Sequence, residues 1–136
     1  MSRYDVIIIG AGPGGIFAAY ELAKKAPELK VAVFEAGNSL EKRKCPIDGK
    51  KIKSCINCKT CAIMSGFGGA GAFSDGKYNI TNDFGGTLYE YIGRKNAIDL
   101  MNYVDEINTA NGGENTKLYS TANTHLKKIC MQNDLH

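Results

Sequence analysis

Residues 10–15 have the types and spacing of a phosphate-binding turn. They read Gly-Ala-Gly-Pro-Gly-Gly, which supplies the pattern Gly-x-Gly-x-x-Gly. In this pattern the first glycine allows a tight turn, the second leaves room for a pyrophosphate, and the third lets a helix pack closely on a strand. Glu35 lies 20 residues after Gly15, where a carboxylate would accept hydrogen bonds from ribose hydroxyls and repel a 2′-phosphate. The residues predicted to bind a dinucleotide here are Gly10, Gly12, Pro13, Gly14, Gly15, Glu35 and Ala36.

A second glycine-rich segment, residues 66–77, could also contact a ligand through its backbone. It reads Gly-Phe-Gly-Gly-Ala-Gly-Ala-Phe-Ser-Asp-Gly-Lys, and small residues leave a main chain that can touch a flat or charged group without obstruction. The candidates in it are Gly68, Gly69, Ala70, Gly71, Ser74, Asp75 and Lys77. Pro13-Gly14 in the first turn is similar to the form found in FAD-binding flavoproteins, so the predicted dinucleotide is FAD. Arg43 follows Glu35 by eight residues, and we expect it against the pyrophosphate.

Four of the five cysteines lie between residues 45 and 61. Cys55, Cys58 and Cys61 form a Cys-x2-Cys-x2-Cys triplet, and Cys45 precedes it by ten residues. Four thiolates could hold zinc tetrahedrally or an iron–sulfur cluster that relays electrons to a flavin. In the bacterial ferredoxin run the fourth cysteine follows the triplet, whereas Cys45-Pro46 precedes it here. Two other interpretations are a Cys58–Cys61 redox pair that exchanges electrons with the flavin and unligated thiols in a loop.

The two glycine segments need a scaffold that places them together. The sequence predicts a buried strand at Tyr4–Ile9, a helix with one apolar face at Gly14–Lys25 and a second strand at Lys30–Glu35. A strand–helix–strand unit of this length favours parallel pairing with a right-handed crossover. The predicted fold class is therefore α/β, a Rossmann-type domain that binds FAD or NAD(P).

Beyond this unit the sequence predicts loops and helices. The predicted parts are a nucleotide-binding unit at 1–36, a cysteine- and lysine-rich loop insertion at 37–64, a glycine-rich flavin-contacting segment at 65–82 and a mainly helical part at 83–136. In the last part, helices are expected over residues 87–110 and 122–132. A doubly wound sheet needs more strands than the two predicted, so we expect an incomplete FAD-binding domain.

Composition excludes several classes of protein. The 136 residues are 43% hydrophobic and 23% charged, which is typical of a globular domain. The sequence has neither an apolar run of about 18 residues that would span a membrane nor the pattern of a signal peptide, so we expect a cytoplasmic protein. A net charge of +3 is too small to indicate nucleic-acid binding. The basic residues between 42 and 59 fit a solvated loop, or a positive surface near phosphates or an acidic electron-transfer partner.

Together these motifs resemble those of a family of bacterial and archaeal FAD-dependent dehydrogenases. The resemblance rests on the first turn with residues 16–22, on Arg43-Lys44-Cys45-Pro46, on the cysteine triplet and on residues 68–77, and it runs from residue 4 to about residue 105. It implies FAD, a small-molecule redox substrate or electron donor, and a cytoplasmic enzyme several-fold longer than this chain. It also implies that the substrate domain and the second half of the FAD site lie outside these residues.

The function predicted from the sequence is therefore the FAD-binding part of a flavin-dependent oxidoreductase. Two alternatives remain at this point, namely an NAD-binding oxidoreductase domain of the same fold and a non-catalytic nucleotide- or metal-binding remnant. No histidine lies near the glycine segments, so no residue is assigned as a general base.

Overall fold

The computed structural model describes residues 3–83, 85–120 and 124–135. The chain divides into two compact units, Met1–Lys77 and Tyr78–His136. This boundary falls inside the segment 65–82 that the sequence groups as one part. The predicted nucleotide site and the four clustered cysteines therefore belong to the first unit.

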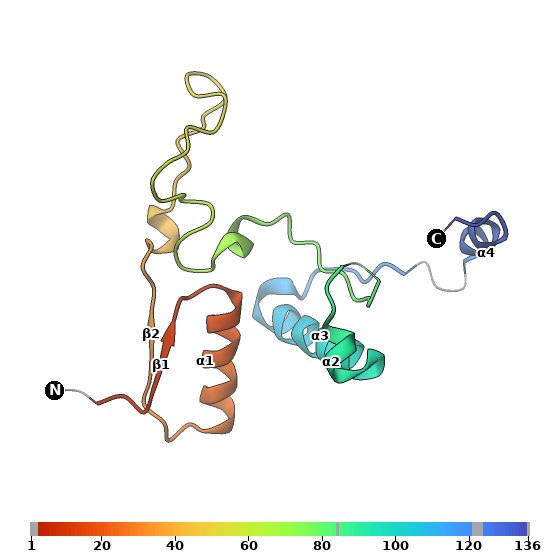
Figure 1. The fold of residues 1–136 in the computed structure, drawn as a ribbon, viewed down its shortest axis with the longest axis horizontal. Coiled ribbons are helices and arrows are strands. Elements are labelled where there is room, and N and C mark those ends of the chain that lie inside the picture. Colours follow the sequence, from red (N-terminus) through yellow and green to blue (C-terminus); the bar gives the residue numbers. More distant parts are fainter. Residues whose placement is uncertain (1–2, 84, 121–123, 136) are drawn as a thin grey trace. The chain divides into compact units, whose positions relative to one another are not determined.

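The first unit is built on a strand–helix–strand motif (Figure 1). Strand β1 (Val6–Ile9) is followed by helix α1 (Pro13–Lys25) and strand β2 (Val31–Phe34). The strands pair in parallel, with Val6 opposite Val31 and Ile9 opposite Phe34. This confirms the predicted α/β unit and its parallel pairing. The helix begins at a proline, whose missing N–H is not needed in the first turn, and it ends before Pro27.

The two faces of β1 differ in burial. Val6 and Ile8 are half-buried, whereas Ile7 is 56% exposed and Ile9 is 81% exposed. The alternation follows from the period of two along a strand, because α1 covers one face. The sequence predicts a strand buried throughout, so the structure corrects that prediction for the outer face.

The rest of the first unit is mainly irregular backbone. It contains two short 3-10 helices, η1 (Leu40–Lys42) and η2 (Ala70–Phe73). Between them a long loop leaves the sheet and returns, drawn in yellow in Figure 1. This loop brings the second glycine segment back to the carboxyl ends of the strands, where Gly68 and Phe67 donate to the carbonyls of Ala11 and Asn38.

The regular secondary structure in the described part of the second unit is helical. It contains α2 (Leu88–Ile92), α3 (Arg94–Asn108), the π-helical turn η3 (Thr109–Gly113) and α4 (His125–Gln132). The single helix predicted over 87–110 is wrong in one respect, because the chain breaks at Gly93, where φ is 82° and ψ is 151°. Glycine adopts this conformation without a Cβ penalty.

Two further features complete the second unit. Ala97 and Ile107 of α3 are buried in it. Helix α4 begins at His125 with Thr124 Oγ1 accepting from the amide of Lys127 at 3.2 Å, and the predicted start at residue 122 lies outside the described residues. Across the described parts of both units, we find no helix with the length and apolar character needed to cross a lipid bilayer.

Candidate functional site

Three backbone segments of the first unit meet at the carboxyl ends of β1 and β2. The amide of Gly68 donates to the carbonyl of Ala11 at 2.8 Å, and the amide of Phe67 donates to the carbonyl of Asn38 at 3.0 Å. The amide of Ala11 donates to Glu35 Oε2 at 2.7 Å. The first glycine turn, the end of β2 and the second glycine segment are thereby joined, as the sequence predicts for a nucleotide-binding crevice.

Two glycines of the first turn are required by local geometry, Gly10 by its backbone conformation and Gly15 by close packing. Gly10 has a φ of +97°, which favours glycine. A Cβ built at Gly15 would overlap the carbonyl oxygen of Gly10 and lie 3.3 Å from Ile8 Cγ2, so α1 can approach β1 only without a side chain there. A Cβ on Gly69 would lie 3.2 Å from the Cα of Gly12. The two glycine segments are therefore in backbone contact.

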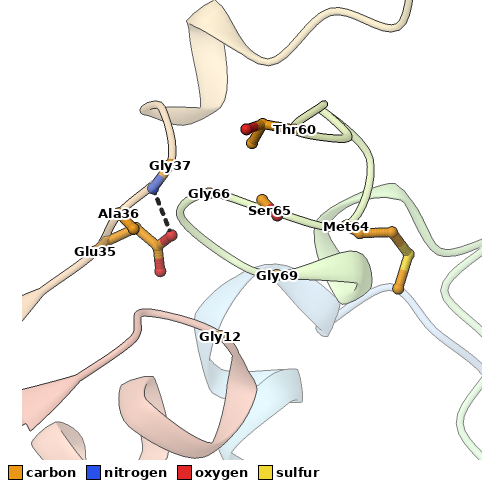
Figure 2. Close-up of a pocket in the computed structure, with 9 residues that line it drawn as sticks. All are labelled: Gly12, Glu35, Ala36, Gly37, Thr60, Met64, Ser65, Gly66 and Gly69. Atoms are coloured by element: carbon orange, nitrogen blue, oxygen red, sulfur yellow. Dashed lines mark hydrogen bonds between the residues drawn. The ribbon is translucent and has the colours of Figure 1, made fainter. Parts of the chain in front are cut away.

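A cavity of about 330 Å³ opens between these segments (Figure 2). Its lining combines residues from the turn, from the end of β2 and from the chain that leads into the second glycine segment. They are Gly12, Glu35, Ala36, Gly37, Thr60, Met64, Ser65, Gly66 and Gly69. The volume is at the lower end of the range for small-molecule sites, so the cavity fits part of a dinucleotide.

Glu35 is held by backbone amides at the edge of the cavity. Its Oε2 accepts from Ala11 at 2.7 Å and its Oε1 accepts from Gly37 at 2.8 Å. These two bonds, with that of Ala11 contributing most, hold the pKa of the Glu35 carboxyl below its usual value of 4.5. A carboxylate has about four acceptor positions, so it keeps acceptor capacity for hydroxyl groups of a ligand.

The start of α1 offers a complementary site for an anion. No side chain caps this helix terminus, and its first turn carries no acidic residue. A Cβ added to Gly14 would meet no atom within 4 Å, so the space beside the turn is open. Free amides at a helix N-terminus, together with the helix dipole, attract phosphate groups. The uncapped amides and the Glu35 carboxylate form a donor and acceptor set that fits the phosphate and ribose of a nucleotide.

Arg43 is a buried charged residue whose side chain is bound by backbone carbonyls. The residue is only 3% exposed. Its Nε donates to the carbonyl of Ala62 at 2.9 Å, and Nη2 donates to that of Ile63 at 2.6 Å. Its Nη1 donates to the carbonyls of Phe67 at 2.6 Å and Gly69 at 2.9 Å. The guanidinium therefore organises the backbone beside the cavity, and its contact with a pyrophosphate stays a prediction.

Part of the predicted site lies elsewhere in the described chain. Ser74 and Asp75 form local turns by accepting from the amides of Gly76 at 2.9 Å and Lys77 at 3.3 Å. Lys77 also pairs with Asp75 at 3.0 Å, with both side chains exposed, and this hydrogen-bonded lysine holds the pKa of Asp75 below its usual value. None of these three residues lines the cavity in the part of the chain that is described. Their contact with a flavin stays a prediction.

Sequence reasoning missed five residues of the cavity wall. They are Gly37, Thr60, Met64, Ser65 and Gly66. For Gly37 and Gly66 the sequence offered an indication, because both are glycines next to a predicted motif. A Cβ at Gly37 would lie 2.5 Å from the Cα of Gly66, and this close approach explains why both positions are glycine. The other three have ordinary polar or flexible side chains, and only the return of the loop places them here.

The four clustered cysteines share a second cavity in the same unit. Cys45, Cys55, Cys58 and Cys61 line a space of about 330 Å³. All are free thiols, and Cys61 is the least exposed of them. Within the described ranges, no three His, Cys, Asp or Glu side chains lie close enough together to hold a metal ion. The predicted set is thus brought together, but without a ready coordination sphere for one ion.

Known proteins are similar to parts of this chain. Residues 1–41 match the model of the Thi4 family. A thiamine thiazole synthase of Yarrowia lipolytica is 64% identical over 33 residues, which is 24% of this chain and 10% of that protein. One from Phaeosphaeria nodorum has the same identity and coverage. An uncharacterised protein of Clostridium beijerinckii is 39% identical over 71 residues, 52% of this chain and 13% of that protein.

These matches are short relative to the proteins concerned. The chain spans about a tenth of the length of the curated relatives it matches. No solved structure matches the chain. The family match therefore covers the strand–helix–strand unit, and the match to the bacterial relative extends over about half of the chain.

Proposed function

We propose that the first unit binds the adenosine and pyrophosphate part of FAD and belongs to a flavin-dependent oxidoreductase. The observation that carries this proposal is the cavity itself, in which the Glu35 carboxylate faces the same space as the uncapped turn at Gly12. The carboxylate would bind the ribose hydroxyls, and the amides of the first turn of α1 would bind the phosphates. FAD, when bound, supplies the hydride and electron chemistry.

Two further points support FAD over a generic nucleotide. The match to the Thi4 family over residues 1–41 covers the unit that forms the turn and Glu35, and it supports a flavin-type site. The second glycine segment contacts this turn through backbone atoms at Gly68 and Gly69, where a flat ring could lie along the main chain. We do not extend thiazole synthesis to this chain, because a nucleotide-binding unit serves many reactions.

The cavity would bind only the nucleotide part of FAD. The lining residues supply groups for a ribose and phosphates, and the cavity volume of about 330 Å³ is small for a complete dinucleotide. We therefore propose that this chain contributes the nucleotide half of the FAD site in a cytoplasmic enzyme, and that further residues bind the ring and a small-molecule electron donor.

Equilibrium binding to the purified chain tests the proposal. FAD is titrated while its fluorescence is followed, and ADP, FMN, NAD and NADP are added as competitors. We expect ADP to displace FAD and FMN to have no effect, because the site binds the adenosine end. Failure of ADP to compete would contradict the proposal, and tighter binding of NAD than of FAD would favour the NAD-binding alternative.

A further inference from the structure

The loop between η1 and the second glycine segment brings four thiols from two separate parts of the chain to one cavity. Cys45 comes from the outgoing limb, and Cys55, Cys58 and Cys61 come from the returning limb. The rest of the lining is largely apolar and consists of Pro46, Ile47, Ile56, Asn57 and Ala62. A long loop would not keep four thiols around one space unless its two limbs were fixed to each other.

The tip of the loop is closed by Asp48. Its Oδ1 accepts from the amides of Lys50 and Lys51 at 2.8 Å and from that of Ile52 at 2.9 Å. The amide of Asp48 donates to the carbonyl of Ile52 at 3.1 Å. This turn reverses the chain, so that Cys45 lies opposite the triplet.

The base of the loop is held by Arg43. This buried residue precedes Cys45 by two positions, and it donates to the carbonyl of Ala62, the residue after Cys61, at 2.9 Å. The carbonyl of Cys61 in turn accepts from the amides of Met64 at 3.2 Å and Ser65 at 2.9 Å. The Arg43 side chain therefore links the backbone next to Cys45 with the backbone next to Cys61.

A multi-iron cluster needs a different arrangement of thiols from a single ion. A tetrahedral zinc site needs every sulfur about 2.3 Å from one point, and within the described ranges no group of three metal-binding side chains is placed to hold an ion. A cluster is bound by thiolates on different irons, so its ligands surround a volume, as these four do.

The sequence pattern favours the same ligand. A Cys-x2-Cys-x2-Cys triplet is typical of four-iron clusters, and in two-cluster ferredoxins the Cys-Pro at the end of one run ligates the other cluster. The fourth ligand of a triplet thus comes from a Cys-Pro remote in sequence. Here Cys45-Pro46 is remote from the triplet and lines the same cavity. We propose that Cys45, Cys55, Cys58 and Cys61 ligate a four-iron iron–sulfur cluster.

Charge and position fit this ligand. Four thiolates give the site a negative charge, and the same loop carries five lysines at positions 44, 50, 51, 53 and 59, which favour this charge by Coulomb attraction. The returning limb also lines both cavities. Cys58 and Cys61 line the cysteine cavity, and Thr60 and Ser65 line the nucleotide cavity. The cluster would therefore sit beside the nucleotide site, although its binding does not depend on FAD.

Anaerobic reconstitution tests the cluster without reference to the nucleotide. The chain is incubated without oxygen with equal amounts of ferrous and ferric iron and with sulfide, desalted, and analysed for iron, acid-labile sulfide, visible absorption and, after one-electron reduction, electron paramagnetic resonance. We expect about four iron and four sulfide per chain, with the spectrum of a reduced four-iron cluster. Parallel incubation with zinc alone tests the single-ion alternative.

Cysteine variants locate the ligands. Cys58→Ser and Cys45→Ser should each lower bound iron several-fold, whereas the matched control Cys130→Ser, at an exposed thiol in α4, should leave it unchanged. Far-ultraviolet circular dichroism shows whether each variant keeps its secondary structure. Three results would overturn the proposal: no retained iron and sulfide in the unaltered chain, retention of zinc alone at one ion per chain, or equal loss of iron in the folded Cys58 and Cys130 variants.

Discussion

The carboxylate of Glu35 accepts a hydrogen bond of 2.7 Å from the backbone amide of Ala11. This bond joins the end of β2 to the middle of the glycine turn, 24 residues apart in sequence. The carboxylate thus shapes the turn before any ligand arrives, and it remains at the edge of the cavity. On the proposed function, nucleotide binding and the local fold are coupled through this one side chain.

Glu35→Gln should therefore weaken the binding of adenosine nucleotides. The amide side chain keeps one acceptor oxygen, so it can serve either the turn or the ribose but not both as the carboxylate does. We expect ADP affinity to fall roughly 10- to 100-fold, the range for loss of charge-assisted hydrogen bonds, as measured by isothermal titration calorimetry. Glu28→Gln, an exposed change in the turn before β2, is the matched control. Unchanged affinity in Glu35→Gln would show that the carboxylate does not bind the ribose.

The sequence predicts the strand–helix–strand unit well because its determinants are local. Gly10 is required by its backbone angle and Gly15 by a helix–strand contact. Both requirements select glycine, so they can be recognised from the residue type alone. The return of the loop to the cavity is not predictable in this way, because it depends on Arg43 reaching carbonyls up to 26 residues away. Similarly, the break at Gly93 was hidden by an apolar pattern that continues across it.

Gly15→Ala should destabilise the first unit. The new methyl group would overlap the carbonyl of Gly10 and press on Ile8, so α1 must move away from β1. We expect a loss of about 1–3 kcal/mol of unfolding free energy, as for other overpacked sites, measured by urea denaturation. Gly14→Ala is the matched control, because a Cβ there meets nothing within 4 Å and alanine favours helix by up to about 1 kcal/mol. Equal effects of the two changes would refute the packing argument.

Arg43→Lys should damage both cavities although it keeps the charge. An ammonium group cannot reproduce the planar fork that now serves the carbonyls of residues 62, 63, 67 and 69. We expect a loss on the order of 3 kcal/mol, because buried carbonyls lose charge-assisted bonds, together with weaker binding of ADP. The measurements are urea denaturation and calorimetry.

The control for Arg43 is Arg94→Lys in the second unit. Arg94 pairs with Asp83 at 3.3 Å with both side chains exposed, and such pairs contribute less than about 1 kcal/mol. A loss at Arg43 no larger than that at Arg94 would mean that the carbonyl contacts do not hold the loop.

The turn at Asp48 should respond to acid. Three backbone amides donate to its carboxylate, that of Ile52 making the strongest contribution, and they lower its pKa from the usual value of 3.8. A lowered pKa in the folded chain means that the turn is stabilised above the unfolded pKa and loses this stabilisation as the pH falls through the folded value. We expect the amide resonances of Lys50, Lys51 and Ile52 to titrate together in nuclear magnetic resonance spectra, with a midpoint below 3.8. Asp48→Asn should abolish this common titration, and a midpoint at or above the usual value would contradict the assignment of the turn to the carboxylate.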